Sequence, residues 1–254
     1  MASLTHTTPR GPLADFVSSL WDYRAEPPAH AVERLLPSPF PSLIVNLRDN
    51  HLLLAGPSTR PTTIETAPQC QTMGLTFQPG AATLLSLPAS EVLNADLPLD
   101  LLWKSEVAQL QERLHFAGTP GERLRIFETW MTRRLRDARP PDRVVAPALA
   151  YLERTEQRVS IDALAKRFGL TSRRLAQIFA REVGLSPKAY HRLHRFQCVL
   201  RSVHGRGEAD WTEVALAAGY YDQAHFNHHF REYAGCTPSE YLAAQGPYWR
   251  HLPL

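Results

Sequence analysis

Apolar residues at helical spacing are concentrated in the C-terminal part of the chain, where one pattern of hydrophobic and polar positions occurs twice. Residues 219–241 place Phe226, Phe230 and Tyr233 on one helix face, between an N-cap at Asp222 and a stop formed by glycine and proline. Residues 169–190 repeat this pattern. At a constant offset of 51 residues, the pairs are Leu175 with Phe226, Phe179 with Phe230, Gly184 with Gly235, Pro187 with Pro238, and Tyr190 with Tyr241. The chain therefore carries two copies of one supersecondary unit.

A short helix and a glycine turn precede the second helix of each copy. Ser160 caps the first short helix, Gly169 follows it, and Thr171 caps the next one; Gly219 makes the second turn. A helix, a turn and a capped second helix form the helix-turn-helix arrangement, whose second helix enters the major groove of DNA. Residues 145–153 predict a leading helix, and residues 187–203 a long helix between the copies. At ~1.5 Å per residue this long helix spans ~24 Å. Together with the units packed at its ends, it can place the two second helices roughly one DNA turn, ~34 Å, apart.

Polar side chains on the faces opposite the apolar stripes supply DNA-binding chemistry. Gln and Asn pair bidentately with adenine, Arg with guanine, and His donates to N7 or O6. The residues predicted to face the bases are Arg173, Ala176, Gln177, Gln223, Ala224, Asn227 and His228. Those predicted to contact phosphates or position the module are Thr171, Ser172, Arg174, Arg181, Lys188, Asp222 and Arg231.

The N-terminal part has short apolar runs separated by prolines, a pattern typical of strands. Residues 43–47 and 52–55 flank residues 48–51 and predict a hairpin, residues 72–77 predict a third strand, and residues 62–66 a weaker one. A small β-sandwich or barrel-like domain is expected. Residues 81–87 begin a short helix after the last of these strands.

Two amphipathic helices follow, over residues 105–116 and 119–138, with predicted caps at Ser105 and Thr119. Their apolar stripes have two possible partners. They pack on the β-domain, or residues 105–138 form a homodimer interface with a second copy of the chain. Prolines and charges mark residues 139–144 as a linker. The expected α+β organisation is a β-rich sensing or dimerisation domain over 1–138, a DNA-binding domain over 145–245, and a tail over 246–254.

Charge is distributed unevenly along the 254 residues. Residues 1–140 hold 13 Lys and Arg against 14 Asp and Glu, whereas residues 141–254 hold 15 against 11. The excess of positive charge in the repeated half modestly favours a nucleic-acid partner. No apolar run reaches the ~20 residues of a membrane helix, and the first residues lack the order of a secretory signal, so a cytoplasmic protein without a membrane partner is expected. Three separated cysteines suggest reduced structural thiols.

The second copy carries the motif residues Gly219-Tyr220, Gln223, His225-Phe226, Phe230-Arg231 and residues 235–241, GCTPSEY. With these residues the repeated half resembles the AraC/XylS transcription regulators over about residues 145–245. The first copy matches its counterpart in the family without a gap, except that Ala176 stands where members often carry a longer polar side chain. The resemblance implies a DNA-binding regulator, commonly an activator that works with RNA polymerase, with an N-terminal domain that senses a small molecule or dimerises. Residues 1–138 resemble the cupin-like sensing domains of the family loosely, and no effector follows from them.

Other chemistry has less support in the sequence. His225 and His229 have the spacing of a metal-binding helix, but Phe226 replaces the glutamate of that motif and no third ligand is apparent, so no metal or other cofactor is expected. Catalytic constellations are absent, and the chain is expected not to be an enzyme. Two alternatives remain: a repair or ligand-modifying enzyme that uses Cys70, and a regulator that binds a protein partner and no ligand. Candidates for an effector pocket are Trp21, Tyr23, Phe40, Met73 and Trp103.

Overall fold

The strands of the protein form two antiparallel sheets in a computed structural model that describes residues 3–27, 29–155 and 159–254. The strands are β1 Ser3–Thr7, β2 Val17–Arg24, β3 Val32–Leu35, β4 Ser42–Asn46, β5 His51–Ala55, β6 Thr62–Glu65, β7 Gln71–Phe77, β8 Asp96–Pro98 and β9 His251–Pro253. The larger sheet has the order β1-β2-β7-β4-β5-β8, and the smaller sheet has the order β6-β3-β9. The predicted hairpin is confirmed as β4 and β5, with Asn46 paired to His51.

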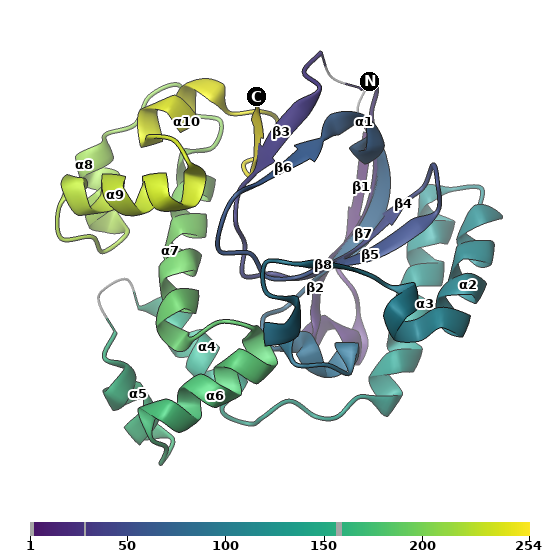
Figure 1. Cartoon of the computed structure of the whole chain (residues 1–254), viewed down its shortest axis with the longest axis horizontal. Coiled ribbons are helices and arrows are strands. Elements are labelled where there is room, and N and C mark those ends of the chain that lie inside the picture. Colours follow the sequence, from purple (N-terminus) through teal and green to yellow (C-terminus); the bar gives the residue numbers. More distant parts are fainter. Residues whose placement is uncertain (1–2, 28, 156–158) are drawn as a thin grey trace.

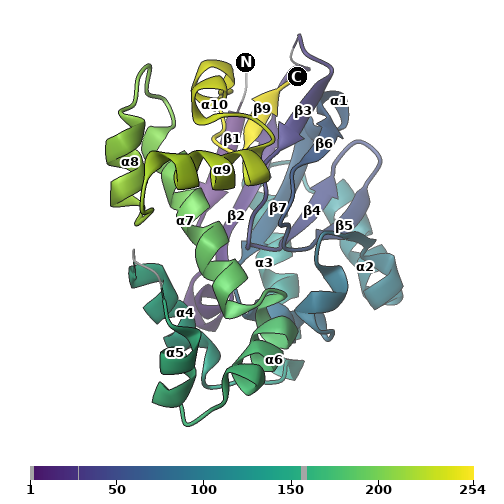
Figure 2. The same cartoon turned by 60° about the vertical axis from the view of Figure 1, so that its left-hand side comes forward.

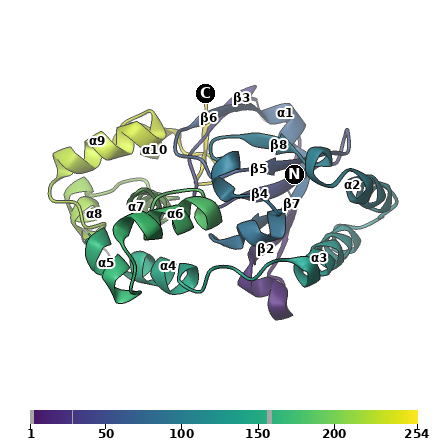
Figure 3. The same ribbon diagram turned by 60° about the horizontal axis from the view of Figure 1, so that its bottom comes forward.

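The helices lie on two sides of these sheets (Figures 1 and 3). They are α1 Thr66–Gln69, α2 Asp100–His115, α3 Pro120–Asp137, α4 Val145–Arg154, α5 Ile161–Arg167, α6 Ser172–Val183, α7 Pro187–Val203, α8 Trp211–Ala217, α9 Gln223–Ala234 and α10 Pro238–Ala244, with 3-10 turns η1 Gly11–Asp15, η2 Ala81–Leu85 and η3 Ala89–Val92. The hairpin of α2 and α3 covers one side, and α4 to α10 form an all-helical region on the other. The predicted α+β organisation, a β-rich N-terminal region with a helical hairpin followed by helices, is confirmed. No described helix combines the length and the apolar character needed to cross a membrane.

The apolar stripes of the hairpin pack onto the larger sheet. Leu110 of α2 and Phe127 of α3 belong to the same buried cluster as Leu43 and Leu75 of the sheet. Arg123 adds a buried ion pair, because its Nε donates to Asp22 Oδ2 of β2 at 2.6 Å. These apolar stripes are therefore buried on the β-domain of the same chain, which is the first of the two packing alternatives.

The predicted start of the first hairpin helix was wrong. Ser105 lies inside α2, which begins at Asp100 and is interrupted by the non-helical backbone of Trp103. Trp103 is 8% exposed and packs in the sheet cluster, so tertiary packing and not a capping side chain sets this boundary. The capping box of the second helix is confirmed, since Thr119 accepts from the backbone N–H of Glu122 and the Glu122 carboxylate accepts from that of Thr119.

The C-terminal residues return to the N-terminal region, although residues 246–254 were expected to form a tail. Strand β9 pairs with β3, and the Arg250 guanidinium donates two hydrogen bonds to the carbonyl oxygen of Leu36, at 3.0 and 2.8 Å. Leu252 and Leu36 are buried in the same cluster as the helices of the C-terminal region. In Figure 2, β9 lies beside β3, directly after α10. The end of the chain therefore joins the smaller sheet to the helical region.

Leu252→Ala is expected to destabilise the protein by about 2–4 kcal/mol, because Leu252 is 3% exposed and its removal leaves a cavity between sheet and helices. Urea unfolding followed by circular dichroism measures the change. Leu254→Ala is the matched control, since Leu254 is 52% exposed, and it should stay within about 0.5 kcal/mol of the unsubstituted chain. Equal effects of the two substitutions would show that β9 is not part of the folded core.

Candidate nucleic-acid interface

The two repeated units have the same turn geometry. Gly169 and Gly219 both adopt left-handed backbone, with φ of 67° and 69°. In each unit the glycine N–H and the next residue's N–H bond back to the preceding short helix: Leu170 N–H donates to Ala165 O at 3.0 Å, and Tyr220 N–H to Ala215 O at 2.9 Å. Left-handed backbone costs glycine little, so this residue type permits the tight turn from the first helix to the second.

The second helix of each unit begins at the predicted cap. Thr171 Oγ1 accepts from the backbone N–H of Arg174 at 3.2 Å, and Asp222 Oδ1 accepts from that of His225 at 2.7 Å. These bonds satisfy N–H groups that the first turn of a helix leaves without a partner. Both helices end at a glycine in left-handed conformation, Gly184 and Gly235. The sequence therefore fixes the start and end of α6 and α9 locally.

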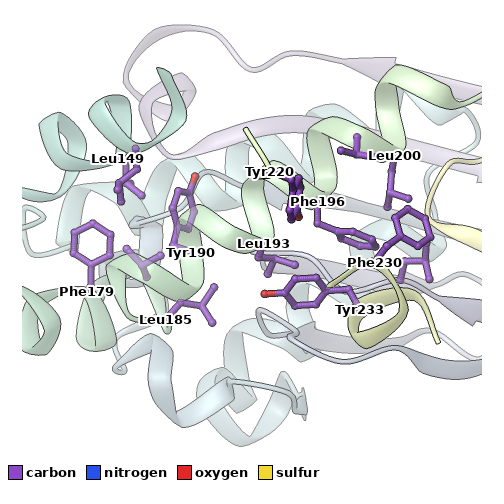
Figure 4. Close-up of a cluster of buried hydrophobic side chains, with 14 of the residues drawn as sticks. Leu149, Phe179, Leu185, Tyr190, Leu193, Phe196, Leu200, Tyr220, Phe230 and Tyr233 are labelled. Carbon is purple, nitrogen blue, oxygen red and sulfur yellow. The ribbon is translucent and has the colours of Figure 1, made fainter. Parts of the chain in front are cut away.

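Helix α7 carries one unit at each end (Figure 4). Tyr190 and Leu193 near its start are fully buried in the cluster that includes Phe179 of α6. Phe196, further along, contacts Phe230 and Tyr233 of α9, with ring centroids 5.3 and 5.0 Å apart. Its 17 residues correspond to a length of ~25 Å. Because both ends are packed, α7 acts as a fixed spacer between α6 and α9.

Cations of α7 also hold the second unit. Arg195 Nε donates to Ala218 O in the turn at 2.6 Å, and its guanidinium carbon lies 4.2 Å from the centroid of the Tyr220 ring. Arg192 Nε donates to the Tyr233 hydroxyl at 3.0 Å, and its Nη2 pairs with Glu232. The sequence pattern did not single out either arginine, because their partners are brought together only by the fold.

Most side chains predicted to face DNA bases lie on the solvent side of α6 and α9. Arg173, Gln177, Gln223, Ala224 and His228 are exposed, and Ala176 and Asn227 are partly exposed. The opposite faces, with Leu175, Phe179, Phe226 and Phe230, are buried. Gln223 also accepts from the Thr212 hydroxyl of α8 at 3.2 Å, which positions its amide at the start of α9.

The residues predicted to contact phosphate fall into two groups. Arg174, Lys188 and Arg231 are exposed. The other side chains are engaged within the protein: Thr171 and Asp222 act as caps, Ser172 donates to Asp162, and Arg181 pairs with Glu182 at 2.9 Å and Asp142 at 3.6 Å. Arg181 lies in the last turn of α6, the end that packs against η2 and η3 of the N-terminal region. Its guanidinium therefore joins α6 to the linker at Asp142.

The histidines of α9 differ in their surroundings. His228 is exposed, whereas His229 is partly buried beside His225, with ring centroids 4.3 Å apart. Burial, together with the positive charges of Arg192 and His225, lowers the pKa of His229 to about 4. His229 is therefore neutral at pH 7 and belongs to the packed side of the helix. Among the described residues, no group of three or more His, Cys, Asp or Glu side chains is placed to hold a metal ion.

The candidates for an effector pocket lie in different surroundings in the described structure. Met73 and Trp103 belong to the sheet core, Trp21 lies against Gly74, Tyr23 contacts the ring of Tyr248, and Phe40 lies under the guanidinium of Arg201.

The thiol of Cys70 is poorly suited to nucleophilic chemistry. It is 6% exposed, donates to the carbonyl oxygen of Thr66 at 3.2 Å, and has its pKa raised by burial. A buried, protonated thiol is a weak nucleophile, which disfavours the enzyme alternative.

Comparisons with known proteins give one family match in each part of the chain. A helix-turn-helix domain family matches residues 164–244, and a domain of unknown function (DUF6597) matches residues 5–98. A search of curated proteins finds no match.

Similar solved structures include the C-terminal domain of AraT, a response regulator from Geobacillus stearothermophilus, at 19% identity over 43% of this chain and 93% of that one, with a TM-score of 0.39. A probable AraC family transcriptional regulator from Rhodopseudomonas palustris CGA009 is 29% identical over 40% of this chain and 96% of that one, with a TM-score of 0.35. ToxT from Vibrio cholerae is 10% identical over 96% of this chain and 97% of that one, with a TM-score of 0.43.

Two helix-turn-helix units on one connecting helix, inside the matched region, define a DNA-binding protein. With the motif residues of both units, they identify residues 164–244 as an AraC-type helix-turn-helix domain.

Proposed function

We propose that one copy of this chain recognises a specific duplex site by inserting α6 and α9 into two successive major grooves on the same side of the DNA. The observation that carries the proposal is the placement of α6 and α9 at opposite ends of α7 (Figures 1 and 2), each with polar side chains on its solvent side. A spacer of ~25 Å between packed units is compatible with grooves that recur every ~34 Å. The site therefore contains two half-sites, one for each helix.

The proposed base contacts divide between the helices. Arg173 and Gln177 serve the first half-site, with Ala176 suited to a thymine methyl group. Gln223, Asn227 and His228 serve the second, with Ala224 beside them. Arg174, Lys188 and Arg231 are assigned to phosphates, because exposed cations at the edge of a recognition helix contribute affinity without selecting bases.

The N-terminal region is the proposed regulatory part. It packs on the C-terminal end of α6 through η2 and η3, so a change in this region reaches the first DNA-binding unit directly. We propose an activator that presents the bound complex to RNA polymerase, with control by a small molecule. Control by dimerisation or by a protein partner would use a surface other than the stripes of α2 and α3 that are buried on the sheet.

Selection of tight binders from random duplex DNA with the whole chain should return two conserved blocks. On that site, Gln177→Ala is expected to relax base preference in one block only, by about 5- to 150-fold at the affected position, because one good bidentate contact contributes about 1–3 kcal/mol. His228→Ala should relax preference in the other block, by less, because an imidazole donates a single hydrogen bond to a base. Arg231→Ala should weaken all sequences alike and reduce the salt slope of the binding constant by about one.

The control is Arg136→Ala, which removes an exposed cation on α3, outside both units. It should leave the selected sequence and the salt slope unchanged. Recovery of no enriched sequence at low salt would overturn the proposal, as would a His228→Ala protein whose preference is unchanged in both blocks.

A further inference from the structure

Residues 36–38 of the N-terminal region lie inside the helical half of the fold. Leu36 is 0% exposed and is buried with the helices of both DNA-binding units, not with the core of the larger sheet. Its carbonyl oxygen accepts both hydrogen bonds from Arg250, and the next carbonyl oxygen, that of Pro37, accepts one from Nε2 of the fully buried Gln197 in α7. This segment therefore holds the helix that connects the two units.

A second contact is made at the end of α6. The backbone of Gly184, which ends this helix, is buried against the N-terminal region. A Cβ atom at this position would lie 2.9 Å from the carbonyl oxygen of Ala89 in η3 and 3.1 Å from Cγ of Pro57. The first of these distances is shorter than a Cβ atom tolerates, so glycine permits the close approach. The first unit is therefore seated directly on Pro57 and Ala89.

The two contacts are joined within the N-terminal region. Ser38 N–H donates to Ser58 O at 3.1 Å, and Ser58 N–H donates to Ser38 O at 2.8 Å. Ser58 follows Pro57, which contacts the end of α6, and Ser38 follows Pro37, which is bonded to α7. Both prolines hold φ at about −65°, which restricts the backbone of the two segments. We call residues 36–38 and 57–58 the bridge.

The second unit is attached to the bridge through the end of the chain. The Tyr241 ring of α10 lies 5.7 Å from that of Phe230 in α9, and its hydroxyl donates to Trp249 O at 2.8 Å. Trp249 precedes Arg250, which bonds to Leu36 of the bridge. A continuous set of contacts therefore runs from α9 through the bridge to α6, separate from the path along α7.

We propose that the bridge sets the relative orientation of α6 and α9, and with it the spacing of the two DNA half-sites, with Gly184 and Gln197 as positioning residues. Helix α7 sets the separation along its own axis. The bridge fixes the rotation of one unit relative to the other, because it attaches to α6 and to the segment after α10 and not to α7 alone. Parts of a chain move relative to each other unless their interface is large and apolar, and Leu36 lies in an apolar core. The effect on DNA rests on the proposed DNA-binding function, whereas the restraint on motion does not.

A spacing series on the selected DNA site tests the proposal with the whole chain. One base pair added or removed between the blocks shifts them by ~3.4 Å and rotates them by ~35°. The unsubstituted chain should lose about tenfold or more in affinity, comparable to one mismatched base pair. Gly184→Ala, which pushes η3 away from α6, and Gln197→Met, which removes the bond to Pro37, should reduce this loss to about threefold or less, half of the penalty in free energy. Base preference within each block should stay unchanged, because the exposed faces of α6 and α9 are intact.

The matched control is Gly205→Ala. Gly205 has the same left-handed backbone as Gly184, with φ of 76° against 83°, but a Cβ atom there would meet no described part of the chain within 4 Å. The backbone strain is therefore comparable while the bridge is left intact. This protein should keep the full spacing penalty, and circular dichroism checks that all three variants are folded.

Pulsed electron paramagnetic resonance measures the restraint without DNA. Spin labels are attached at exposed positions of α5 and α10 through Lys166→Cys and Ser239→Cys, in a chain whose Cys198 and Cys236 are replaced by serine. The labels report the distance between the two units. A single narrow distance distribution is expected, which both bridge variants should broaden or shift and the control should not.

A spacing penalty that is unchanged in both bridge variants would overturn the proposal, since α7 alone would then set the spacing. Distance distributions as narrow in the bridge variants as in the control would overturn it even for a chain that selects no DNA. Distances that broaden as expected in a chain that selects no two-block site would instead reject only the proposed function.

Discussion

Phe230→Ala is expected to destabilise the protein by about 3–5 kcal/mol, the range for removing a large buried aromatic side chain. Phe230 is 1% exposed, and its ring lies 5.3 Å from that of Phe196, 5.6 Å from Phe226 and 5.7 Å from Tyr241, measured between centroids. It thus joins α9 to α7 and α10. The substitution should also remove sequence preference in the block bound by α9. Urea unfolding and binding to the selected site measure the two effects.

Tyr221→Ala is the matched control for this substitution, because Tyr221 precedes the same helix and is 84% exposed. Its stability should lie within about 0.5 kcal/mol of that of the unsubstituted chain. A Phe230→Ala protein as stable as the control would contradict the packing of α9 on α7.

Arg123→Met is expected to cost about 3–5 kcal/mol, because it removes the buried partner of the Asp22 carboxylate and leaves only the half-exposed guanidinium of Arg24, 3.7 Å away. Asp22 is 1% exposed and Arg123 is 3% exposed, and Arg123 also donates to the carbonyl oxygen of Ala117 at 3.3 Å. This pair fixes the first turn of α3 to β2. The double substitution Asp22→Leu with Arg123→Met should recover most of the loss, since two apolar side chains replace two charges. Equal destabilisation in the single and double variants would mean that lost packing, and not the unpaired charge, is responsible.

Local signals made the helical half predictable from the sequence. The caps Thr171 and Asp222, the turn glycines and Pro187 each act within a few residues, so the bounds of α6, α7 and α9 follow from short-range chemistry. The apolar stripes of α6 and α9 then determine which side chains remain exposed. The solvent-facing position of Gln177 and His228 was predictable for this reason.

Long-range contacts were not predictable in the same way. Strand β9 forms only because β3 is available, with Glu33 paired to Pro253, and three residues without a strong strand pattern give no local sign of it. Strand β2 has the sequence VSSLWDYR, in which polar and apolar residues do not alternate clearly. Its buried Asp22 is compensated by Arg123 of α3, which a sequence pattern does not reveal, and by Arg24 of the same strand.

The most direct test of simultaneous binding by both helices is a spacing series on the selected DNA site, measured with the whole chain. Inserting about five base pairs, half a helical turn, between the two blocks moves one block to the opposite side of the duplex. Because α7 is packed at both ends, the chain cannot follow, and affinity should fall to that of a duplex carrying a single block. Unchanged affinity after the half-turn insertion would contradict the account, since it would mean that only one of α6 and α9 contacts bases.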